Sequence, residues 1–360
     1  MMRIGERHMK PITKEKIGWG FVATGRIAKD FAECLQLMDD CYIAAVGSRT
    51  MESAKRFTDV YGGTPYGSYE EMMQDPNVDI VYIATPHMMH EENVKMAAKY
   101  GKHILCEKPF AVNRASAQRM FDAANEAGVF IMEGLWSRFF PAWQYAKKVV
   151  QSGELGRLIS IDAATCWGAP RDETGFPPDD RRIDPNLAGG ALLDAGIYVL
   201  AATSVAIGGM THRPKEIFST MRFEESGVDS DTDMLLELDD GVTAHLVCSL
   251  HRRNHECTIY CENGKIYLPM HRNPRQVTVT KRIPSGARGA AGHLRDTTET
   301  RTLEFPYLRT GFQFQAAAVH ECLRNGWQEC PQVPQDETLT LIGICDEIRA
   351  KHGFKYPFEG

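Results

Sequence analysis

The first 141 residues alternate between short apolar runs and segments whose apolar residues recur at helical spacing. Strands are predicted over 16–22, 42–46, 78–84, 103–106 and 129–132, and helices over 26–38, 51–61, 91–100 and 115–127. Such alternation is typical of a doubly wound α/β fold, in which helices cover both faces of a parallel sheet. We therefore expect an N-terminal, dinucleotide-binding Rossmann domain over residues 1–141.

The pattern changes after Pro141. Following a helix over 143–151, alternating β-branched segments at 158–165, 216–223, 233–238, 242–249 and 257–261 predict an open, mostly antiparallel sheet. An apolar helix over 187–207 is expected against this sheet, the Gly- and Ala-rich stretch 285–296 is expected to be a mobile loop, and helices over 311–325 and 336–352 close the chain. We assign 142–360 to a C-terminal α+β domain, whose last helices can pack back on the first domain.

Composition narrows the function classes. The formal net charge is -6 and the basic residues are scattered, which argues against a nucleic-acid partner. The N-terminus is charged, unlike a signal peptide, and no run of eighteen apolar residues predicts a membrane span. Ten cysteines without metal-site spacing favour reduced thiols in a cytoplasmic protein. The first eleven residues are expected to be extended or disordered and have no inferred role.

The first strand leads into a turn of small residues followed by a helix. In the Rossmann fingerprint such a turn lets the backbone approach a pyrophosphate, which then meets the free N–H groups of the helix. Gly18 and Gly20 lie inside the strand and do not form this turn. The predicted phosphate-binding residues are Ala23, Thr24, Gly25, Arg26 and Ile27.

The end of the second strand bears on the choice of cofactor. NAD enzymes usually carry Asp or Glu there to bind the ribose 2′-hydroxyl, whereas this chain has Ser48 and Arg49. A hydroxyl and a guanidinium suit a 2′-phosphate, so NADP is favoured and NAD stays possible. Arg49 could instead be a solvent-exposed turn residue, or it could stack on adenine without contacting a phosphate.

Two motifs follow in order behind the turn: Glu107-Lys108-Pro109 and the stretch Gly189–Tyr198, which contains Asp194-Ala-Gly-Ile-Tyr198. With Ala84–His87 and Trp136–Pro141, they resemble the family of glucose-fructose oxidoreductase and inositol dehydrogenase (Gfo/Idh/MocA). Within it the chain is most similar to the branch of dimeric dihydrodiol dehydrogenase and NADP-dependent xylose dehydrogenase. The resemblance runs from about Lys16 to the last helix. It implies a sheet-mediated homodimer or homotetramer and a small-molecule sugar, polyol or diol as substrate.

Alcohol oxidation requires hydride transfer to the cofactor and removal of the hydroxyl proton. Lys108 ends a predicted strand, where ligands of parallel sheets bind, and Asp194 and Tyr198 are one helical turn apart. The resemblance implies that these three residues are catalytic, with Tyr198 as proton donor or acceptor. Many relatives have His at the Tyr198 position, which weakens the analogy with inositol dehydrogenases. The alternatives are a surface lysine for Lys108, a helix-capping or buried paired carboxylate for Asp194, and core aromatic packing for Tyr198.

The resemblance assigns further residues to the cofactor pocket. Glu107 is expected near the nicotinamide ribose, although a structural role is the alternative. The other cofactor-pocket residues are Thr85, Pro86, His90, Trp136 and Arg138. His87 and His90 could equally be capping or packing residues at a strand–helix junction. Arg181 and Phe176 are substrate-pocket candidates by position.

The sequence therefore predicts an NADP-dependent dehydrogenase or reductase. Two alternatives remain: a non-catalytic regulator that binds the cofactor on the same fold, and an enzyme that recycles a tightly bound cofactor. A regulator that had lost its chemistry would be expected to lack Lys108 or Tyr198, and both are present. No metal is expected, because neither His87–His90 nor His251–His255 has supporting ligands at metal spacing.

Overall fold

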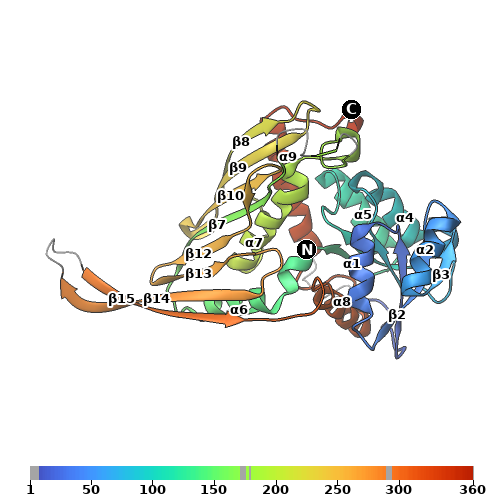
Figure 1. Cartoon of the computed structure of the whole chain (residues 1–360), viewed down its shortest axis with the longest axis horizontal. Coiled ribbons are helices and arrows are strands. Elements are labelled where there is room, and N and C mark those ends of the chain that lie inside the picture. Colours follow the sequence, from blue (N-terminus) through green and yellow to red (C-terminus); the bar gives the residue numbers. More distant parts are fainter. Residues whose placement is uncertain (1–7, 171–175, 178–179, 289–293, 360) are drawn as a thin grey trace.

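The chain builds two sheets that face each other across a layer of helices. A computed structural model describes residues 8–170, 176–177, 180–288 and 294–359. Figure 1 shows the parallel sheet on the right, the second sheet on the left, and helices α7 (Ile197–Ile207) and α9 (Gln335–Lys351) between them. The expected combination of a Rossmann sheet and a mostly antiparallel sheet is confirmed.

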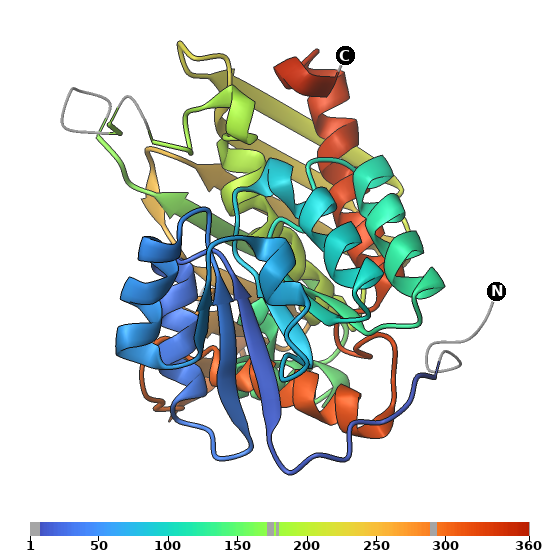
Figure 2. The same cartoon turned by 90° about the vertical axis from the view of Figure 1, so that its right-hand side faces the viewer.

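The N-terminal sheet is parallel throughout and has the strand order β3-β2-β1-β4-β5-β6. This is the order of dinucleotide-binding folds, with the first strand beside the fourth. The strands are β1 (Ile17–Val22), β2 (Cys41–Gly47), β3 (Thr64–Tyr66), β4 (Ile80–Ile83), β5 (His103–Glu107) and β6 (Ile131–Gly134). The helices are α1 (Arg26–Leu35), α2 (Met51–Tyr61), α3 (Tyr69–Met73), α4 (His90–Lys99) and α5 (Arg114–Glu126). Figure 2 shows this sheet with its covering helices in front.

The second sheet has the order β15-β14-β13-β12-β7-β10-β9-β8, with β11 (Arg253–Asn254) paired to β7. Its one parallel pair is β7 with β10, so the sheet is mixed but mostly antiparallel. The other strands are β7 (Leu158–Trp167), β8 (Glu216–Phe223), β9 (Asp229–Glu237), β10 (Thr243–Ser249), β12 (Cys257–Cys261), β13 (Gly264–Leu268), β14 (Gln276–Arg288) and β15 (Leu294–Glu304).

Helices from the second half join the two sheets. Helix α6 (Pro141–Ser152) leads into the second sheet, α8 (Gln313–Asn325) packs on α1, and α9 packs against both α5 and α7. One hydrophobic cluster runs from Phe21 and Phe31 through Trp143 to Ile259, so the parts share a core. The apolar segment Pro185–Ile207 is long enough to cross a membrane, but 94% of its most apolar window is buried inside the protein.

Two expectations about elements need correction. The helix expected over 187–207 begins only at Ala191, because Gly190 has a φ of +114° that a helix cannot contain. The expected loop 285–296 is largely strand, since β14 continues to Arg288 and β15 resumes at Leu294, with 289–293 outside the described residues. Figure 1 shows this hairpin as an arm that extends beyond the body. Residues 8–12 are extended and hydrogen-bond the end of α8, whereas 1–7 are outside the described residues.

Candidate active site

The carboxyl ends of five adjacent parallel strands gather most of the predicted site residues at one edge of the sheet. The turn after β1 carries Ala23 to Ile27, Ser48 and Arg49 follow β2, and Thr85 and Pro86 follow β4. Glu107 ends β5 with Lys108 directly after it, and Trp136 follows β6. Ligands of open α/β sheets bind at this edge, so its geometry suits a dinucleotide.

The start of α1 has the features of a phosphate site. Ala23 has a φ of +89°, which turns the chain sharply out of β1, and a Cβ added to Gly25 would meet no atom within 4 Å. Gly25 is the N-cap of α1 and offers no capping side chain, whereas Thr50 caps α2 and Asn113 caps α5. The first N–H groups of α1 are therefore available to an anion.

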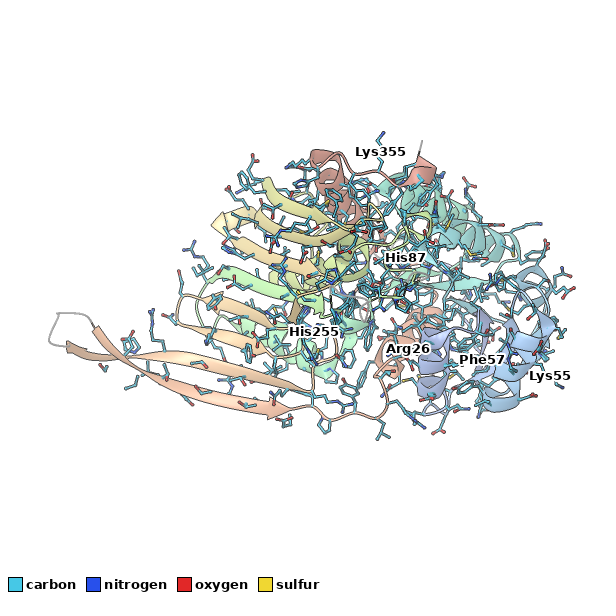
Figure 3. All side chains as sticks on the ribbon, turned by 45° about the horizontal axis from the view of Figure 1, so that its top comes forward. Arg26, Lys55, Phe57, His87, His255 and Lys355 are labelled. Carbon is cyan, nitrogen blue, oxygen red and sulfur yellow. The ribbon has the colours of Figure 1, made fainter. Side chains whose placement is uncertain are left out.

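Side chains around this turn leave the approach to α1 open. Arg26 is 94% exposed (Figure 3) and has only a weak 4.0 Å contact with Asp30, and Ile27 is half-buried. Ser48 is nearly buried and its amide donates to the Tyr66 carbonyl. Arg49 is exposed and makes no hydrogen bond or ion pair within the described chain. A pyrophosphate with a second anionic group near Arg49 fits this edge.

Lys108, Asp194 and Tyr198 lie together in the structure. The Lys108 ammonium donates to the Asp194 carbonyl oxygen at 2.8 Å and to its Oδ1 at 3.1 Å. The same Nζ lies 4.8 Å from the centre of the Tyr198 ring. Lys108 is 9% exposed and Asp194 is 2% exposed, so this ion pair is shielded from water. One cation thus contacts both the carboxylate and the phenol.

The charges in this cluster are fixed by their neighbours. Burial disfavours the ammonium of Lys108, but Asp194, Tyr198 and Glu107 together outweigh burial and raise the Lys108 pKa. Burial would also raise the pKa of Asp194, but Lys108 and Arg181 together hold it well below its ordinary value. Near neutral pH Asp194 is therefore a carboxylate and Lys108 an ammonium.

Arg181 and His87 form a second layer around Asp194. Arg181 donates through Nη2 to Asp194 Oδ1 and through Nη1 to His87 Nε2, each at 3.3 Å. Burial and the guanidinium lower the pKa of His87 well below its ordinary value, so the ring is neutral and its Nδ1–H donates to the Ala188 carbonyl. Figure 3 shows His87 where the two sheets meet. The sequence suggested both residues by position only.

Tyr198 sits in an aromatic setting with one direct polar partner. The indole Nε1–H of Trp136 donates to the Tyr198 hydroxyl oxygen at 2.9 Å, and the Trp136 ring stacks on Phe312. The Trp167 ring meets the Tyr198 ring edge-on at 6.4 Å, and Arg272 lies over both rings. Because the hydroxyl oxygen accepts from Trp136, its own proton can be donated to a ligand.

The helix that carries Asp194 is held by residues far apart in the sequence. Asp194 lies in a π-helical turn (Leu192–Gly196) directly before α7. The Asp229 carboxylate accepts from the backbone N–H of Leu192 at 2.7 Å, and a Cβ added to Gly190 would come within 2.2 Å of Asp229 Oδ1. Nothing in the local sequence marks Asp229, because its partner lies thirty-seven residues away along the chain.

Several residues predicted to line the pocket are tied to the protein itself. His90 is fully buried and both its ring nitrogens contact backbone carbonyls, those of Thr85, Pro109 and Phe110. It therefore links the loops after β4 and β5. Thr85 also accepts through Oγ1 from Asn93. The guanidinium of Arg138 forms a buried ion pair with Glu337 and donates to the Gln332 carbonyl, which commits it to the segment around α9.

Glu107 is held by hydrogen bonds within the protein. Burial raises the pKa of Glu107, which accepts from Tyr82 at 2.5 Å and from the Lys108 backbone N–H.

Among the described residues, only Asp40, Cys41 and His320 bring three metal-ligand atoms together. Both ring nitrogens of His320 are engaged, with Trp19 and Asp40, and burial raises the pKa of Cys41 to about 12. Internal hydrogen bonding accounts for this group.

Comparison with protein families matches both halves of the chain. Residues 17–135 match the oxidoreductase family with an NAD-binding Rossmann fold, and residues 143–267 match the GFO/IDH/MocA C-terminal domain. The expected family resemblance is thereby confirmed.

Relatives cover nearly the whole chain. Trans-1,2-dihydrobenzene-1,2-diol dehydrogenase of Mus musculus is 34% identical over 94% of this chain and 98% of its own length, and that of Homo sapiens is 32% identical with the same coverage. Among solved structures, aldose-aldose oxidoreductase from Caulobacter crescentus has a TM-score of 0.80 at 24% identity, covering 94% of this chain and 98% of its own. A 3-ketoreductase from Actinomadura kijaniata, solved with NADP, has a TM-score of 0.79 at 24% identity, covering 93% and 97%.

Proposed function

The chain belongs to the GFO/IDH/MocA family of oxidoreductases, and on that premise we propose that it interconverts an alcohol and a carbonyl group on a sugar, polyol or vicinal diol. The observation that carries the proposal is the contact of one buried ammonium, Lys108, with both Asp194 and Tyr198 at the edge where dinucleotides bind. When bound, a nicotinamide cofactor supplies the redox chemistry by accepting or donating a hydride.

Tyr198 is the proposed proton acceptor in alcohol oxidation and the proton donor in carbonyl reduction. The phenolate that forms when Tyr198 releases its proton is stabilised by the Lys108 ammonium beside its ring and by the Trp136 N–H at its oxygen. Asp194 keeps Lys108 charged and fixes its position with two hydrogen bonds. Arg181, which also contacts Asp194, stands at the more exposed side of the cluster.

We propose NADP as the preferred cofactor. The position after β2 offers Ser48 and the exposed guanidinium of Arg49 in place of an acidic residue. A guanidinium can form bidentate bonds with a 2′-phosphate, which NAD lacks. The uncapped start of α1 would take the pyrophosphate, and Thr85, Pro86 and Glu107 would line the nicotinamide half.

The test follows reduced-cofactor absorbance with NADP or NAD and a panel of sugars, polyols and diols, in both directions. Lys108→Ala and Tyr198→Phe run beside the unchanged protein, with Tyr260→Phe on β12 as a control phenol. Turnover that both site variants lose and the control keeps supports the proposal. Absence of turnover in either direction contradicts it. Cofactor released on denaturing the purified protein would then favour cofactor recycling, and reversible binding alone would favour a regulator.

We also propose a homodimer or homotetramer formed through the outer face of the second sheet. Phe218 on β8 and Leu235 on β9 are paired neighbours and both are exposed, at 58% and 38%. Exposed apolar neighbours on a sheet face favour association. Light scattering on the purified protein should give a multiple of the 40.3 kDa chain mass, and Leu235→Lys should reduce it. A monomer at micromolar concentration would contradict the proposal.

A further inference from the structure

On the side of the second sheet, the Tyr198 ring is bordered by three side chains. They are Trp167, His255 and Arg272, and we call this group the Arg272 wall. The Arg272 guanidinium lies 4.5 Å from the centre of the Trp167 ring and 5.6 Å from that of Tyr198. The His255 ring lies 6.0 Å from Trp167 (His255 is labelled in Figure 3). The wall is thus continuous with the proposed catalytic tyrosine, on the side of the second sheet.

The polar atoms of the Arg272 wall have no partner within the described part of the chain. Trp167 Nε1, Arg272 Nε and His255 Nδ1 are all enclosed, and none makes a hydrogen bond there. The two Nη atoms of Arg272 are not among the enclosed atoms, and Arg272 forms no ion pair with a described carboxylate. Its charged edge is therefore open to a ligand.

Charge pairing sets Arg272 apart from the other cations near the site. Lys108 and Arg181 share Asp194, and the buried Arg138 is paired with Glu337. Burial and Arg272 together lower the pKa of His255 to about 4, so the ring is neutral and contributes no opposing charge. A half-buried guanidinium that lacks a counter-ion is best satisfied by an anionic ligand, and its planar fork suits a carboxylate or a phosphate.

We propose that the Arg272 wall binds an anionic group of the substrate, so that the preferred substrate is a sugar or polyol bearing a carboxylate. This inference rests on the proposed function, because it places the reacting carbon at Tyr198 and the anion at Arg272. The 5.6 Å between the Tyr198 ring and the guanidinium brings the two ends of one sugar ring within reach of both groups. A sugar phosphate offers the same charge, and the experiment separates the two.

The experiment compares glucose, glucuronate and glucose 6-phosphate, which share a ring and differ at one end. Turnover is measured with NADP, and binding to the NADP-loaded protein is measured by calorimetry. Arg272→Met keeps an apolar stem on the aromatic rings but removes the charge. The matched control is Arg157→Met, which removes an exposed arginine directly before β7, at the opposite end of that strand from Trp167.

We expect kcat/KM for glucuronate to exceed that for glucose, and to fall about 10- to 100-fold in Arg272→Met, mainly through KM. Glucose turnover should fall less than glucuronate turnover in Arg272→Met, because only the anionic sugar loses a charged partner, and Arg157→Met should behave like the unchanged protein. If the protein prefers glucose 6-phosphate and Arg272→Met abolishes that preference, the result would support an anion subsite at the Arg272 wall and identify its ligand as phosphate. Equal use of the three sugars, unaffected by Arg272→Met, would overturn the inference and leave the proposed function intact.

Calorimetry measures anion binding even if the protein turns over no substrate of the panel. Absence of turnover with every substrate of the panel would contradict the proposed function. Glucuronate binding that Arg272→Met weakens about tenfold or more would still support the anion subsite. Absence of binding by both anions would overturn the subsite as well.

Discussion

Replacing Lys108 with Met separates the structural role of the lysine from its chemical role. The substitution keeps the length of the side chain but leaves the Asp194 carboxylate, 2% exposed, with Arg181 as its remaining ion-pair partner at 3.3 Å. Removing one partner of a buried pair typically costs about 3–5 kcal/mol. Because Arg181 is partly exposed and still contacts Asp194, we expect a loss of about 3 kcal/mol in the free energy of unfolding.

The double variant Lys108→Met/Asp194→Asn distinguishes the two roles. Without a buried charge to compensate, it should regain at least about 2 kcal/mol of the lost free energy of unfolding. Turnover should stay at least about 100-fold below that of the unchanged protein in both variants, because neither has an ammonium beside Tyr198. Chemical denaturation followed by tryptophan fluorescence and reduced-cofactor absorbance measure the two quantities on the same samples.

Lys102→Met is the matched control for this prediction. Lys102 lies just before β5, at the opposite end from Lys108, and its ammonium donates to the backbone carbonyls of Asp75 and Val78. It should lose some stability and keep its turnover. Recovery of both stability and turnover in the double variant would refute the reasoning, because Lys108 would then serve only to neutralise Asp194.

Three further predictions address the neighbours of this cluster. Trp136→Phe removes the N–H that donates to Tyr198 but keeps a ring, so kcat should fall about tenfold; equal kcat would contradict this role. Arg49→Ala should lower kcat/KM for NADP about 10- to 100-fold and leave NAD unaffected, whereas Arg56→Ala on α2, a control arginine paired with Glu52, should change neither. Burial raises the pKa of Glu133 to about 7. The stability that its protonated form contributes is therefore complete below about pH 4.5 and is lost as pH rises through 7. Chemical denaturation should show a free energy of unfolding about 3 kcal/mol lower at pH 8 than at pH 5, and Glu133→Gln should not show this loss.

The sequence predicted the parallel sheet well because each of its central strands is a buried apolar run between amphipathic helices. It missed β14 and β15, whose long hairpin is rich in Thr, Arg and Glu and extends away from the core (Figure 1). Only a few of its side chains, such as Val277 and Val279, are buried, so the period-two signal is weak. The sequence located the apolar helix that includes α7 but not its first residue. That start is set by the positive φ of Gly190, which packs closely against the Asp229 side chain.

The structure brings predicted site residues together where the position along a strand determines the position in space. Lys108, Ser48 and Thr85 could be placed because parallel strands bring their carboxyl ends to one edge. Trp167 ends a strand of the second sheet, and Arg272 lies in the irregular segment after β13. No local pattern shows that these two side chains meet Tyr198, since that depends on how the second sheet packs on α7.

Arg138 and Arg272 show that a ligand-binding arginine is better identified by whether it has a carboxylate partner than by whether it lies in a sequence motif. Arg138 lies in a motif that the resemblance placed at the nicotinamide pocket, yet its guanidinium is paired with Glu337, one hundred and ninety-nine residues away in the chain. Arg272 lies in no motif, yet it contacts the Tyr198 ring and has no described carboxylate as partner. A buried arginine with a carboxylate is already neutralised and has little to gain from a ligand, whereas an unpaired one gains a counter-ion. The same local sequence around Arg138 could serve either role, because the deciding residue comes from α9.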